Sequence, residues 1–432
     1  MILSKTLSTK SFAVYGLGVT GLSVLNCLKK SKVKNFYLWD DDKFKRNSIK
    51  TKPNIKDFLK SLQSVDYIVV SPGINIKNSK NKKILIMNKS KIITDLDLFF
   101  MSNKFTKSIV VTGTNGKSTT CKIIEHLLKK NNLKVKLGGN IGKPILSLNF
   151  KKNTFVIIEA SSFQLSYSKY IKPHYAVILN ITKDHLEWHE SLKNYVDSKF
   201  KVFSLQAKNS YAILNNAQLI KKFKKKHYLS KLVSVNSKEY KKIKEKIQNK
   251  YLSSKVNEEN MNFVYSLSKL LKIKKKKFVN SFSTFKGLPH RNEIFFKRNN
   301  IKFINDSKAT SFEASKLTLE SNKNIFWILG GLPKKGDRFY LKNLKSRIIK
   351  SYIIGNNVRF YKKQLKNNIK YEVSKTLKNC VIKIFKDIKK FSTKPMVVIL
   401  SPSGASYDQY DNFGERGDDF KKLVLFYGNK NF

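Results

Sequence analysis

An apolar, β-branched run passes directly into a glycine-rich turn at IVVTGTNGKSTT, residues 109–120. Such runs favour buried strands, and the glycines allow a tight turn before a following helix. The same order, an apolar run and then glycine or an acid, recurs at FAVYGLG (12–18), VIIEASS (156–162) and WILGG (327–331). Near-continuous apolar strands that alternate with helices are typical of parallel sheets. The chain is therefore expected to be an α/β protein.

Strands of this kind fall into three blocks, with no repeat or low-complexity linker between them. We expect residues 1–95 to form a Rossmann-like N-terminal domain, 96–298 a central domain of the P-loop ATPase type, and 299–432 a C-terminal Rossmann-like domain. A chain of 432 residues, 41% of them hydrophobic, is long enough for two or three domains. In open α/β sheets ligands bind at the carboxyl ends of the strands, which is where the glycines and acids of this chain fall.

The charge is strongly positive, with 87 lysine and arginine residues against 29 acidic ones and a net charge of +58. Nucleic-acid binding is one interpretation. Lysines occur in every segment, however, and few of the basic residues are arginine, which suits phosphates and bases better. We therefore favour a lysine-rich composition without a specific nucleic-acid partner.

The composition also bears on the surroundings of the protein. No apolar run approaches the roughly 20 residues that span a bilayer. Cys27, Cys121 and Cys380 are too few and too far apart for a disulfide framework. A cytoplasmic protein without membrane contact is expected.

The stretch GTNGKST has the features of a phosphate-binding loop. Backbone N–H groups at a helix start and the ammonium of Lys117 can hold phosphates, and a hydroxyl from Ser118 or Thr119 can bind Mg²⁺. Only two residues separate its glycines, whereas a standard Walker A loop has four. The predicted ligand is ATP, and the residues that would hold it are Gly113, Thr114, Asn115, Gly116, Lys117, Ser118 and Thr119.

Other motifs are ambiguous when taken singly. GLGVTG (16–21), with Asp40 about twenty residues later, fits a dinucleotide fingerprint but also an ordinary strand-to-helix turn. Glu159 ends a predicted strand, where a carboxylate can bind Mg²⁺ or simply lie at the sheet edge. Asp184 and His185 follow another predicted strand, so the histidine has either a metal-binding or a structural role.

In their order along the chain, ten motifs resemble those of the Mur ligases over essentially its whole length. They are GLGVTG, SPG (71–73), TGTNGKST, GGNIG (138–142), EASSFQL (159–165), NITKDH (180–185), GLPHR (287–291), NDSKAT (305–310), GGLPKK (330–335) and SPSGASYDQ (401–409). NDSKAT resembles the form in the members that add D-glutamate. The resemblance implies ligation of D-glutamate to UDP-N-acetylmuramoyl-L-alanine through an acyl-phosphate, driven by ATP, in cytoplasmic peptidoglycan synthesis. A monomer is expected.

The resemblance also implies which residues bind the substrates. The UDP-sugar would contact Gly18, Val19, Thr20, Asp40, Gly73, Asn140 and Ser161. The D-glutamate pocket would contain Lys308, Thr310, Lys334, Ser406 and Phe413, with Lys335 competing for the role of Lys334. Asp41 and Asp42 depart from the Asp-Thr-Arg-like stretch of the family, which puts the contacts at that edge in question.

By the same resemblance, Lys117, Glu159, His185 and Lys199 would form the catalytic centre. Two Mg²⁺ ions are implied, with Ser118, Glu159 and His185 as ligands and Lys199 carbamoylated to hold the second. Composition alone would make Lys199 one more surface lysine. Further ATP contacts would come from Asn257, Asn260, Arg291 and Asp306, although Val256 replaces a histidine of the family pattern.

Two other functions stay open. One is a different Mur ligase or a folylpolyglutamate synthase-like amide ligase, against which NDSKAT and SSFQL argue. The other is a basic P-loop ATPase acting on nucleic acid, which the charge and the loop GTNGKST support. That function predicts ATP turnover that nucleic acid stimulates and binding that weakens steeply with salt.

Overall fold

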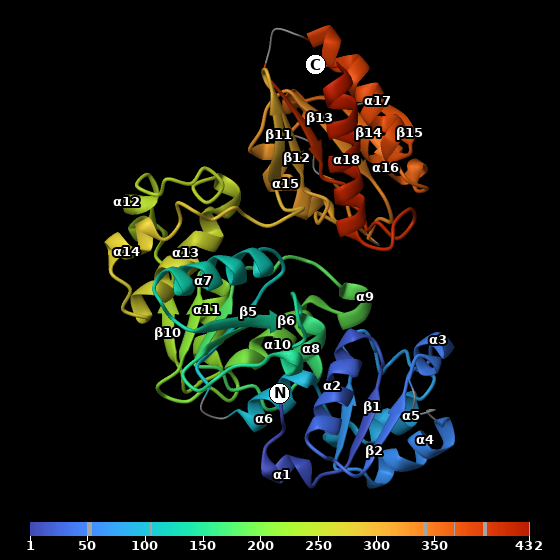
Figure 1. Cartoon of the computed structure of the whole chain (residues 1–432), viewed down its shortest axis with the longest axis vertical. Coiled ribbons are helices and arrows are strands. Elements are labelled where there is room, and N and C mark those ends of the chain that lie inside the picture. Colours follow the sequence, from blue (N-terminus) through green and yellow to red (C-terminus); the bar gives the residue numbers. More distant parts are fainter. Residues whose placement is uncertain are drawn as a thin grey trace. The chain divides into compact units, whose positions relative to one another are not determined.

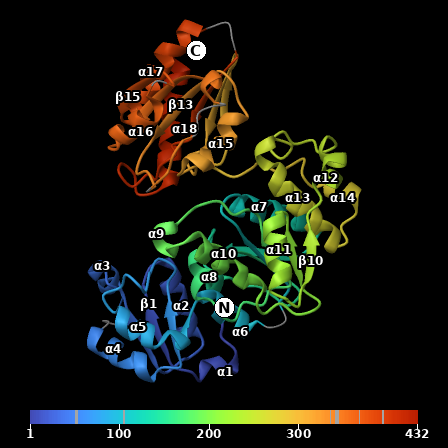
Figure 2. The same cartoon turned by 180° about the vertical axis from the view of Figure 1, so that it is seen from behind.

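A computed structural model describes residues 1–49, 54–103, 106–334, 336–339, 344–366, 368–391 and 395–431. The chain forms two compact units, one of residues 1–253 and 259–285 and the other of residues 254–258 and 286–432. Three sheets, each flanked by helices, follow one another along the chain (Figures 1 and 2), which confirms the α/β class. In the described ranges no helix is long and apolar enough to cross a membrane.

The first sheet is parallel, in the order β2-β1-β3-β4. Its strands are β1 (Phe12–Tyr15), β2 (Phe36–Trp39), β3 (Tyr67–Val70) and β4 (Ile92–Ile93), and its helices are α1 (Lys5–Ser8), α2 (Val19–Lys30), α3 (Lys43–Asn47), α4 (Ile55–Ser64) and α5 (Lys82–Met87). Helix α2 packs closely on the turn after β1, because a Cβ on Gly21 would lie 1.8 Å from the carbonyl oxygen of Gly16. Packing thus requires Gly21 and also Gly16, where an added Cβ would lie 2.6 Å from Cβ of Ser71, whereas an added Cβ on Gly18 would meet no atom within 4 Å.

The second sheet has six parallel strands in the order β10-β9-β8-β5-β7-β6. The strands are β5 (Ser108–Thr112), β6 (Val135–Gly139), β7 (Phe155–Glu159), β8 (Tyr175–Ile178), β9 (Tyr211–Leu214) and β10 (Lys231–Ser234). The helices are α6 (Asp95–Ser102), α7 (Lys117–Lys130), α8 (Ser162–Tyr167), α9 (Leu186–His189), α10 (Leu192–Phe200), α11 (Ala217–Lys225), α12 (Ser237–Lys244), α13 (Lys255–Leu270) and α14 (Lys275–Asn280).

One hydrophobic core joins the first two sheets. Buried side chains from both, such as Val14 and Val110, belong to the same cluster. This continuity explains why the two sheets form a single compact unit. Short 3₁₀ helices complete the secondary structure at η1 (Lys89–Lys91), η2 (Ile145–Ser147), η3 (Lys201–Phe203), η4 (Lys345–Arg347) and η5 (Lys389–Phe391).

The third sheet forms the second unit, in the order β11-β12-β16-β13-β14-β15. Its strands are β11 (Glu293–Arg298), β12 (Ile301–Asn305), β13 (Ile325–Gly330), β14 (Ile348–Ile354), β15 (Tyr371–Lys375) and β16 (Met396–Leu400). Helices α15 (Phe312–Glu320), α16 (Val358–Leu365), α17 (Leu377–Ile388) and α18 (Phe413–Asn431) surround it. Two apolar clusters pack on this sheet. Of two successive residues of β12, Phe303 belongs to one cluster and Ile304 to the other, since neighbouring side chains of a strand point to opposite faces.

The third sheet begins earlier than the sequence suggested. Strand β11 pairs with β12 in antiparallel orientation, although the expected boundary at residue 299 leaves β11 in the central block. Apart from residues 254–258, the second unit starts at residue 286, so it includes β11. The reason is the short connection at 299–300, which folds β11 back onto β12 as a hairpin.

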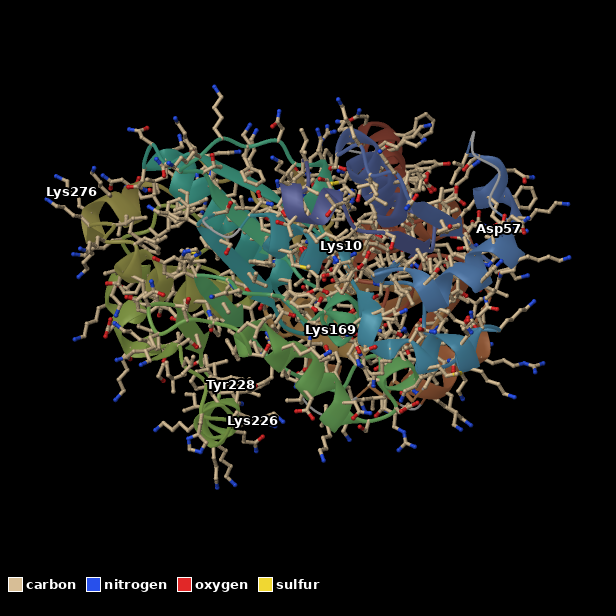
Figure 3. All side chains as sticks on the ribbon, turned by 90° about the horizontal axis from the view of Figure 1, so that it is seen from below. Lys10, Asp57, Lys169, Lys226, Tyr228 and Lys276 are labelled. Carbon is tan, nitrogen blue, oxygen red and sulfur yellow. The ribbon has the colours of Figure 1, made fainter. Side chains whose placement is uncertain are left out.

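Lysine side chains extend from many different elements (Figure 3). Lys10 forms a surface ion pair with Asp66 at 3.0 Å, and Lys226 and Lys276 are exposed on other segments. This spread agrees with a lysine-rich composition.

Candidate active site

The loop between β5 and α7 brings Lys117 to the first position of a helix. Gly116, which precedes α7, has a left-handed backbone with φ of 82°. A Cβ there would lie 2.2 Å from Oδ1 of Asn260. The ammonium of Lys117 donates to the carbonyl oxygens of Gly113, at 3.0 Å, and Thr114, at 2.7 Å. A glycine turn, a helix N-terminus and a lysine together form an arrangement that can hold phosphates.

Asn180, directly after β8, fixes the position of this loop. Its carbonyl oxygen accepts from the N–H of Thr114 at 2.8 Å, and its Oδ1 accepts from the N–H of Asn115 at 2.9 Å. Its amide nitrogen donates to Oε2 of Glu259, on α13, at 2.9 Å. The motif NITKDH contained Asn180, but the sequence pattern assigned it no role. Its place after a strand neighbouring β5 was the available signal.

Helix α13 also contacts α7 through Asn260. The hydroxyl of Thr120 donates to Oδ1 of Asn260 at 3.1 Å. Asn260 therefore lies beside the phosphate-binding loop, as its predicted contact with ATP requires. Asn257 is also buried.

Lys199 is buried in the site and is not the surface lysine that composition alone would favour. It is 1% exposed, and its Nζ donates to the carbonyl oxygen of Gly113 at 2.8 Å. The ammonium lies 4.5 Å from the ring centroid of Tyr195. Burial lowers the pKa of Lys199 well below its usual value, and the neighbouring charge of Lys117 lowers this pKa further. Burial thus favours the uncharged, nucleophilic form of the Lys199 amine.

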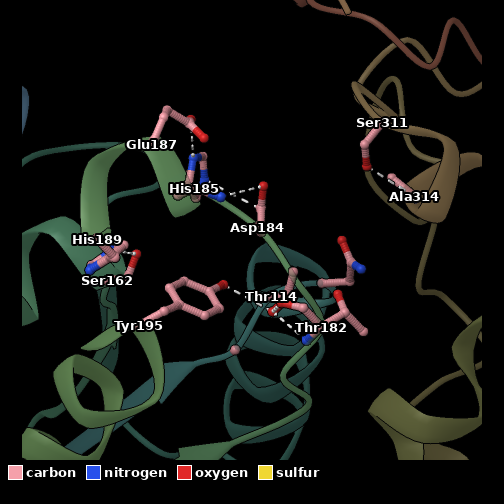
Figure 4. A network of polar contacts seen from close by, with 12 residues as sticks. Thr114, Ser162, Thr182, Asp184, His185, Glu187, His189, Tyr195, Ser311 and Ala314 are labelled. Carbon is pink, nitrogen blue, oxygen red and sulfur yellow. Dashed lines mark hydrogen bonds and ion pairs between the residues drawn. The ribbon is translucent and has the colours of Figure 1, made fainter. Parts of the chain in front are cut away.

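Tyr195 connects α10, the helix that carries Lys199, to the phosphate-binding loop. Its hydroxyl lies 2.9 Å from Oγ1 of Thr114 (Figure 4). Burial raises the pKa of Tyr195, so the phenol stays protonated. The sequence motifs did not point to this residue, although it precedes Lys199 by one helical turn and therefore shares its face.

Glu159, at the end of β7, is the carboxylate best placed to bind a cation. It is 2% exposed, and its Oε1 accepts from the side-chain amide of Asn140 at 2.8 Å. Its Oε2 is buried without a hydrogen-bond partner among the residues that the structure describes, and so are the hydroxyls of Thr112 and Thr182. A buried polar atom without a partner is costly.

These oxygens fit the chemistry of Mg²⁺, which prefers hard oxygen ligands and keeps several waters. Within the described ranges, no group of three or more histidine, cysteine or acidic side chains forms a ready metal cage. The site thus resembles one where few protein ligands hold the ion together with a substrate.

Two histidines follow Asp184 on the same loop and differ in environment. His185 has a left-handed backbone with φ of 53°, its ring lies against Phe163 with centroids 4.7 Å apart, and its Nε2 is 3.3 Å from Oδ2 of Asp184 (Figure 4). His189 is buried, with its Nε2 3.0 Å from Oγ of Ser162. Of the two, His185 has the more accessible ring.

In the first sheet, three of the predicted UDP-sugar residues, Gly18, Val19 and Thr20, lie at the start of α2, and Asp40 directly follows β2. Gly18 caps α2, and Val19 beside it is 74% exposed. The carboxylate of Asp40 is already engaged, because it accepts from the N–H of Leu17 at 2.6 Å and from that of Asp42 at 2.9 Å. Asp40 therefore fixes the turn that presents these residues.

Other contacts bear on the same substrate. The Arg46 guanidinium donates to the carbonyl oxygen of Asp40 and lies over the ring of Trp39, which provides a cation at this edge that the sequence motifs did not identify. At Gly73 an added Cβ would meet no atom within 4 Å. Ser161 caps α8 and accepts from the N–H of Gln164.

The second unit gathers residues after three neighbouring strands, β12, β16 and β13. The ammonium of Lys308 lies 3.7 Å from the ring centroid of Phe413. Leu332 and Ala405 exchange two backbone hydrogen bonds of 2.8 Å, which join the loop GGLP to the loop SPSGAS. Ser406, in the latter loop, is buried.

The other predicted residues of this unit are Asp306, which has defined hydrogen bonds, and three residues of intermediate exposure. Asp306 accepts from the hydroxyls of Thr318 and Ser401, both at 2.9 Å, and burial raises its pKa to about 6. Its carboxylate thus supports its own loop. Three further predicted residues are partly buried: Arg291, Thr310 and Lys334. Lys335 lies outside the described residues.

Comparisons with known proteins agree with this architecture. The family model of the Mur ligase middle domain matches residues 111–279. UDP-N-acetylmuramoylalanine–D-glutamate ligase from Rickettsia bellii (strain RML369-C) is 34% identical over 450 residues, which cover 96% of this chain and 97% of the relative. The enzyme of the same name from Wolbachia sp. subsp. Brugia malayi (strain TRS) is 34% identical over 491 residues, which cover 98% and 97%.

Two solved structures have a similar fold. MurF ligase from Thermotoga maritima in complex with ADP has a TM-score of 0.58 at 14% identity, with 98% of this chain and 100% of that chain covered. UDP-N-acetylmuramate-alanine ligase MurC from the same organism has a TM-score of 0.54 at 15% identity, with 97% and 100% covered. At these identities the likeness concerns the fold alone.

Proposed function

The chain belongs to the Mur ligase family, and we propose that it joins D-glutamate to UDP-N-acetylmuramoyl-L-alanine at the expense of ATP, in peptidoglycan precursor synthesis. Relatives of that name match it over nearly their entire length. The structural observation that carries the proposal is that Lys117 and Lys199 both donate to the carbonyl oxygen of Gly113, while the adjacent strand β7 ends in Glu159, whose Oε2 has no hydrogen-bond partner among the described residues. We place the reaction in the cytoplasm and expect a monomer.

The proposed reaction has two steps. An oxygen of the alanyl carboxylate attacks the γ-phosphorus of ATP, and the bond to ADP breaks, which gives an acyl-phosphate. The amine of D-glutamate then attacks the acyl carbon, the bond to phosphate breaks, and the amine loses a proton as the amide forms. Phosphoryl transfer depends mainly on alignment and on neutralising charge.

The residues of the first unit suit these demands. Lys117 would leave the carbonyl oxygens of Gly113 and Thr114 and donate to the phosphates, while the loop amides provide further donors. Mg²⁺, held by Ser118, Glu159 and His185 with a second ion on carbamoylated Lys199, would neutralise phosphate charge. Burial favours the uncharged amine of Lys199, which is the form of a lysine that reacts with CO₂.

Substrate roles follow the family pattern. The UDP-sugar would bind at Gly18, Val19, Thr20, Asp40, Gly73, Asn140 and Ser161. ATP would further contact Asn257, Asn260, Arg291 and Asp306. D-glutamate would bind at Lys308, Thr310, Lys334, Ser406 and Phe413. Cations and amides in that pocket suit the two carboxylates of the amino acid.

Substitution of Lys117 tests the proposed role of the loop. We expect Lys117→Ala to lower the kcat for phosphate release by about 100-fold or more, since one preorganised charge on the transition state is lost. Circular dichroism and the thermal midpoint should stay near those of the wild type. Lys129→Ala, on the exposed end of the same helix, is the control and should keep full turnover. Near-normal turnover of Lys117→Ala would show that this loop does not bind the ATP used in the reaction.

A further inference from the structure

Arg416, in the first turn of α18, is a fully buried cation that no step above uses. It is 1% exposed. Its Nε donates to Oγ of Ser307 at 3.0 Å, and its Nη2 donates to the carbonyl oxygens of Ser307, at 2.8 Å, and Gly404, at 3.0 Å. One guanidinium thus bridges the loop after β12 and the loop after β16.

The same guanidinium also borders the loop after β13. A Cβ built on Gly331 would lie 3.1 Å from Nη1 of Arg416 and 2.2 Å from the carbonyl oxygen of Ala405. Only glycine leaves room for the two loops and the guanidinium at this point. Arg416 therefore lies where three loops meet at the carboxyl ends of adjacent strands.

These three loops carry the proposed D-glutamate residues. Lys308 and Thr310 directly follow Ser307, Ser406 follows Gly404 by two residues, and Lys334 follows Gly331 by three. The hydroxyl of Ser307 further donates to the carbonyl oxygen of Phe413 at 2.8 Å. Phe413 supports the Lys308 ammonium through its ring. A change at Arg416 thus acts on the three loops that carry these residues.

Among the residues that the structure describes, no carboxylate forms an ion pair with Arg416. In the described part of the second unit, its hydrogen-bond acceptors are two carbonyl oxygens and one hydroxyl, all neutral. The groups that face it electrostatically are Asp408 and the phenols of Tyr361 and Tyr410. Burial lowers the pKa of Arg416 to about 10, so it is charged at neutral pH. Burying a cation without a paired anion lowers stability. A role in function would explain why Arg416 occupies this position.

We infer that Arg416 is a positioning residue for the amino-acid substrate, and this rests on the function proposed above. Its planar fork of donors fixes the three loops in one relative register. Its charge adds a positive potential to the pocket, which favours an amino acid with two carboxylates over one with a neutral side chain. Arg416 acts through the loops and not by contact with the reacting atoms.

Separate Michaelis constants test this inference, because a general loss of stability would not single out one substrate. In Arg416→Gln the KM for D-glutamate should rise about tenfold or more, as expected when a charged hydrogen-bonding group is lost. The KM values for ATP and for the UDP-sugar should change less than about twofold. Arg416→Lys keeps the charge and loses the fork, so it should give an intermediate KM for D-glutamate.

Arg347→Gln is the control, since Arg347 precedes β14 and donates to the carbonyl oxygen of Asn322 away from the three loops. Should Arg416→Gln fail to fold, Ser307→Ala removes one acceptor and keeps the guanidinium. It should still raise the KM for D-glutamate selectively, by about threefold or more. Equal rises in all three Michaelis constants, or an unchanged KM for D-glutamate in the folded variants, would overturn the inference. If the wild type used a different amino acid, the proposed function would be refuted. The role of Arg416 would then be tested by the KM of Arg416→Gln for that amino acid.

Discussion

Two lysines share one acceptor in the candidate site. Lys117 and Lys199 both donate to the carbonyl oxygen of Gly113, at 3.0 and 2.8 Å. Like charges this close repel, which is one reason why the pKa of the buried Lys199 is low. The sequence pattern predicts Lys117, since its motif is local. It does not predict the burial of Lys199, which depends on how α10 packs against the loop.

His189 provides a test of burial at the residue scale. Burial lowers its pKa to about 4 from the usual 6.5. Between these values the unfolded chain binds a proton that the folded chain does not, so the free energy of unfolding should fall as the pH drops from 6.5 to about 4. In His189→Gln this contribution is absent. The thermal midpoint of the variant should therefore gain on that of the wild type as the pH falls through this window.

The exposed His227 gives the matched control for this experiment. The midpoint of His227→Gln, measured against the wild type from pH 6.5 to pH 4, shows the effect of replacing an exposed histidine by glutamine. A constant difference between His189→Gln and the wild type over this range would show that His189 takes up its proton equally in both states, and burial would then not lower its pKa.

At the scale of elements, the strands that end in glycine or an acid were predictable and the edge strands were not. Strands β1, β5, β7 and β13 all occur where their apolar runs indicated. Strand β10 reads KLVS and β15 reads YEVSK. Short, charged strands are common at sheet edges, since they discourage further pairing, and their pattern differs little from that of a loop. Tertiary pairing decides such segments.

The connections that place site residues beside each other are likewise tertiary. The bond between Asn180 and Glu259 joins residues 79 positions apart, and Arg416 reaches Ser307 across 109 positions. The motifs predict loops that carry candidate site residues. They could not predict which side chains hold those loops together, because those side chains lie on elements remote in sequence.

Gly116 tests the link between the phosphate-binding loop and α13. We expect Gly116→Ala to lower ATP-dependent turnover by about 100-fold, because its Cβ would displace Asn260 and shift the loop. Gly142→Ala is the control, since Gly142 also has positive φ, of 69°, but an added Cβ there meets nothing within 4 Å. Equal losses in both variants would mean that backbone strain explains the effect and that contact with α13 does not matter.

For the whole molecule, the large net charge does not account for the proposed function. The net charge of +58 comes from lysines on many elements. Surface pairs such as Lys10 with Asp66 contribute little to stability. The lysines with proposed roles, Lys117 and Lys199 in the first unit and Lys308 in the second, are held by specific contacts. The proposed function therefore depends on a few positioned lysines and not on total charge.

The most direct test of the proposed function is phosphate release from ATP and Mg²⁺, measured with UDP-N-acetylmuramoyl-L-alanine and one amino acid at a time. The panel comprises D-glutamate, L-glutamate, L-alanine and meso-diaminopimelate, with RNA and DNA in separate reactions without the UDP-sugar. We predict turnover that requires both the UDP-sugar and D-glutamate and that nucleic acid does not stimulate. Turnover with a different amino acid, or turnover that needs only nucleic acid, would contradict the proposed function.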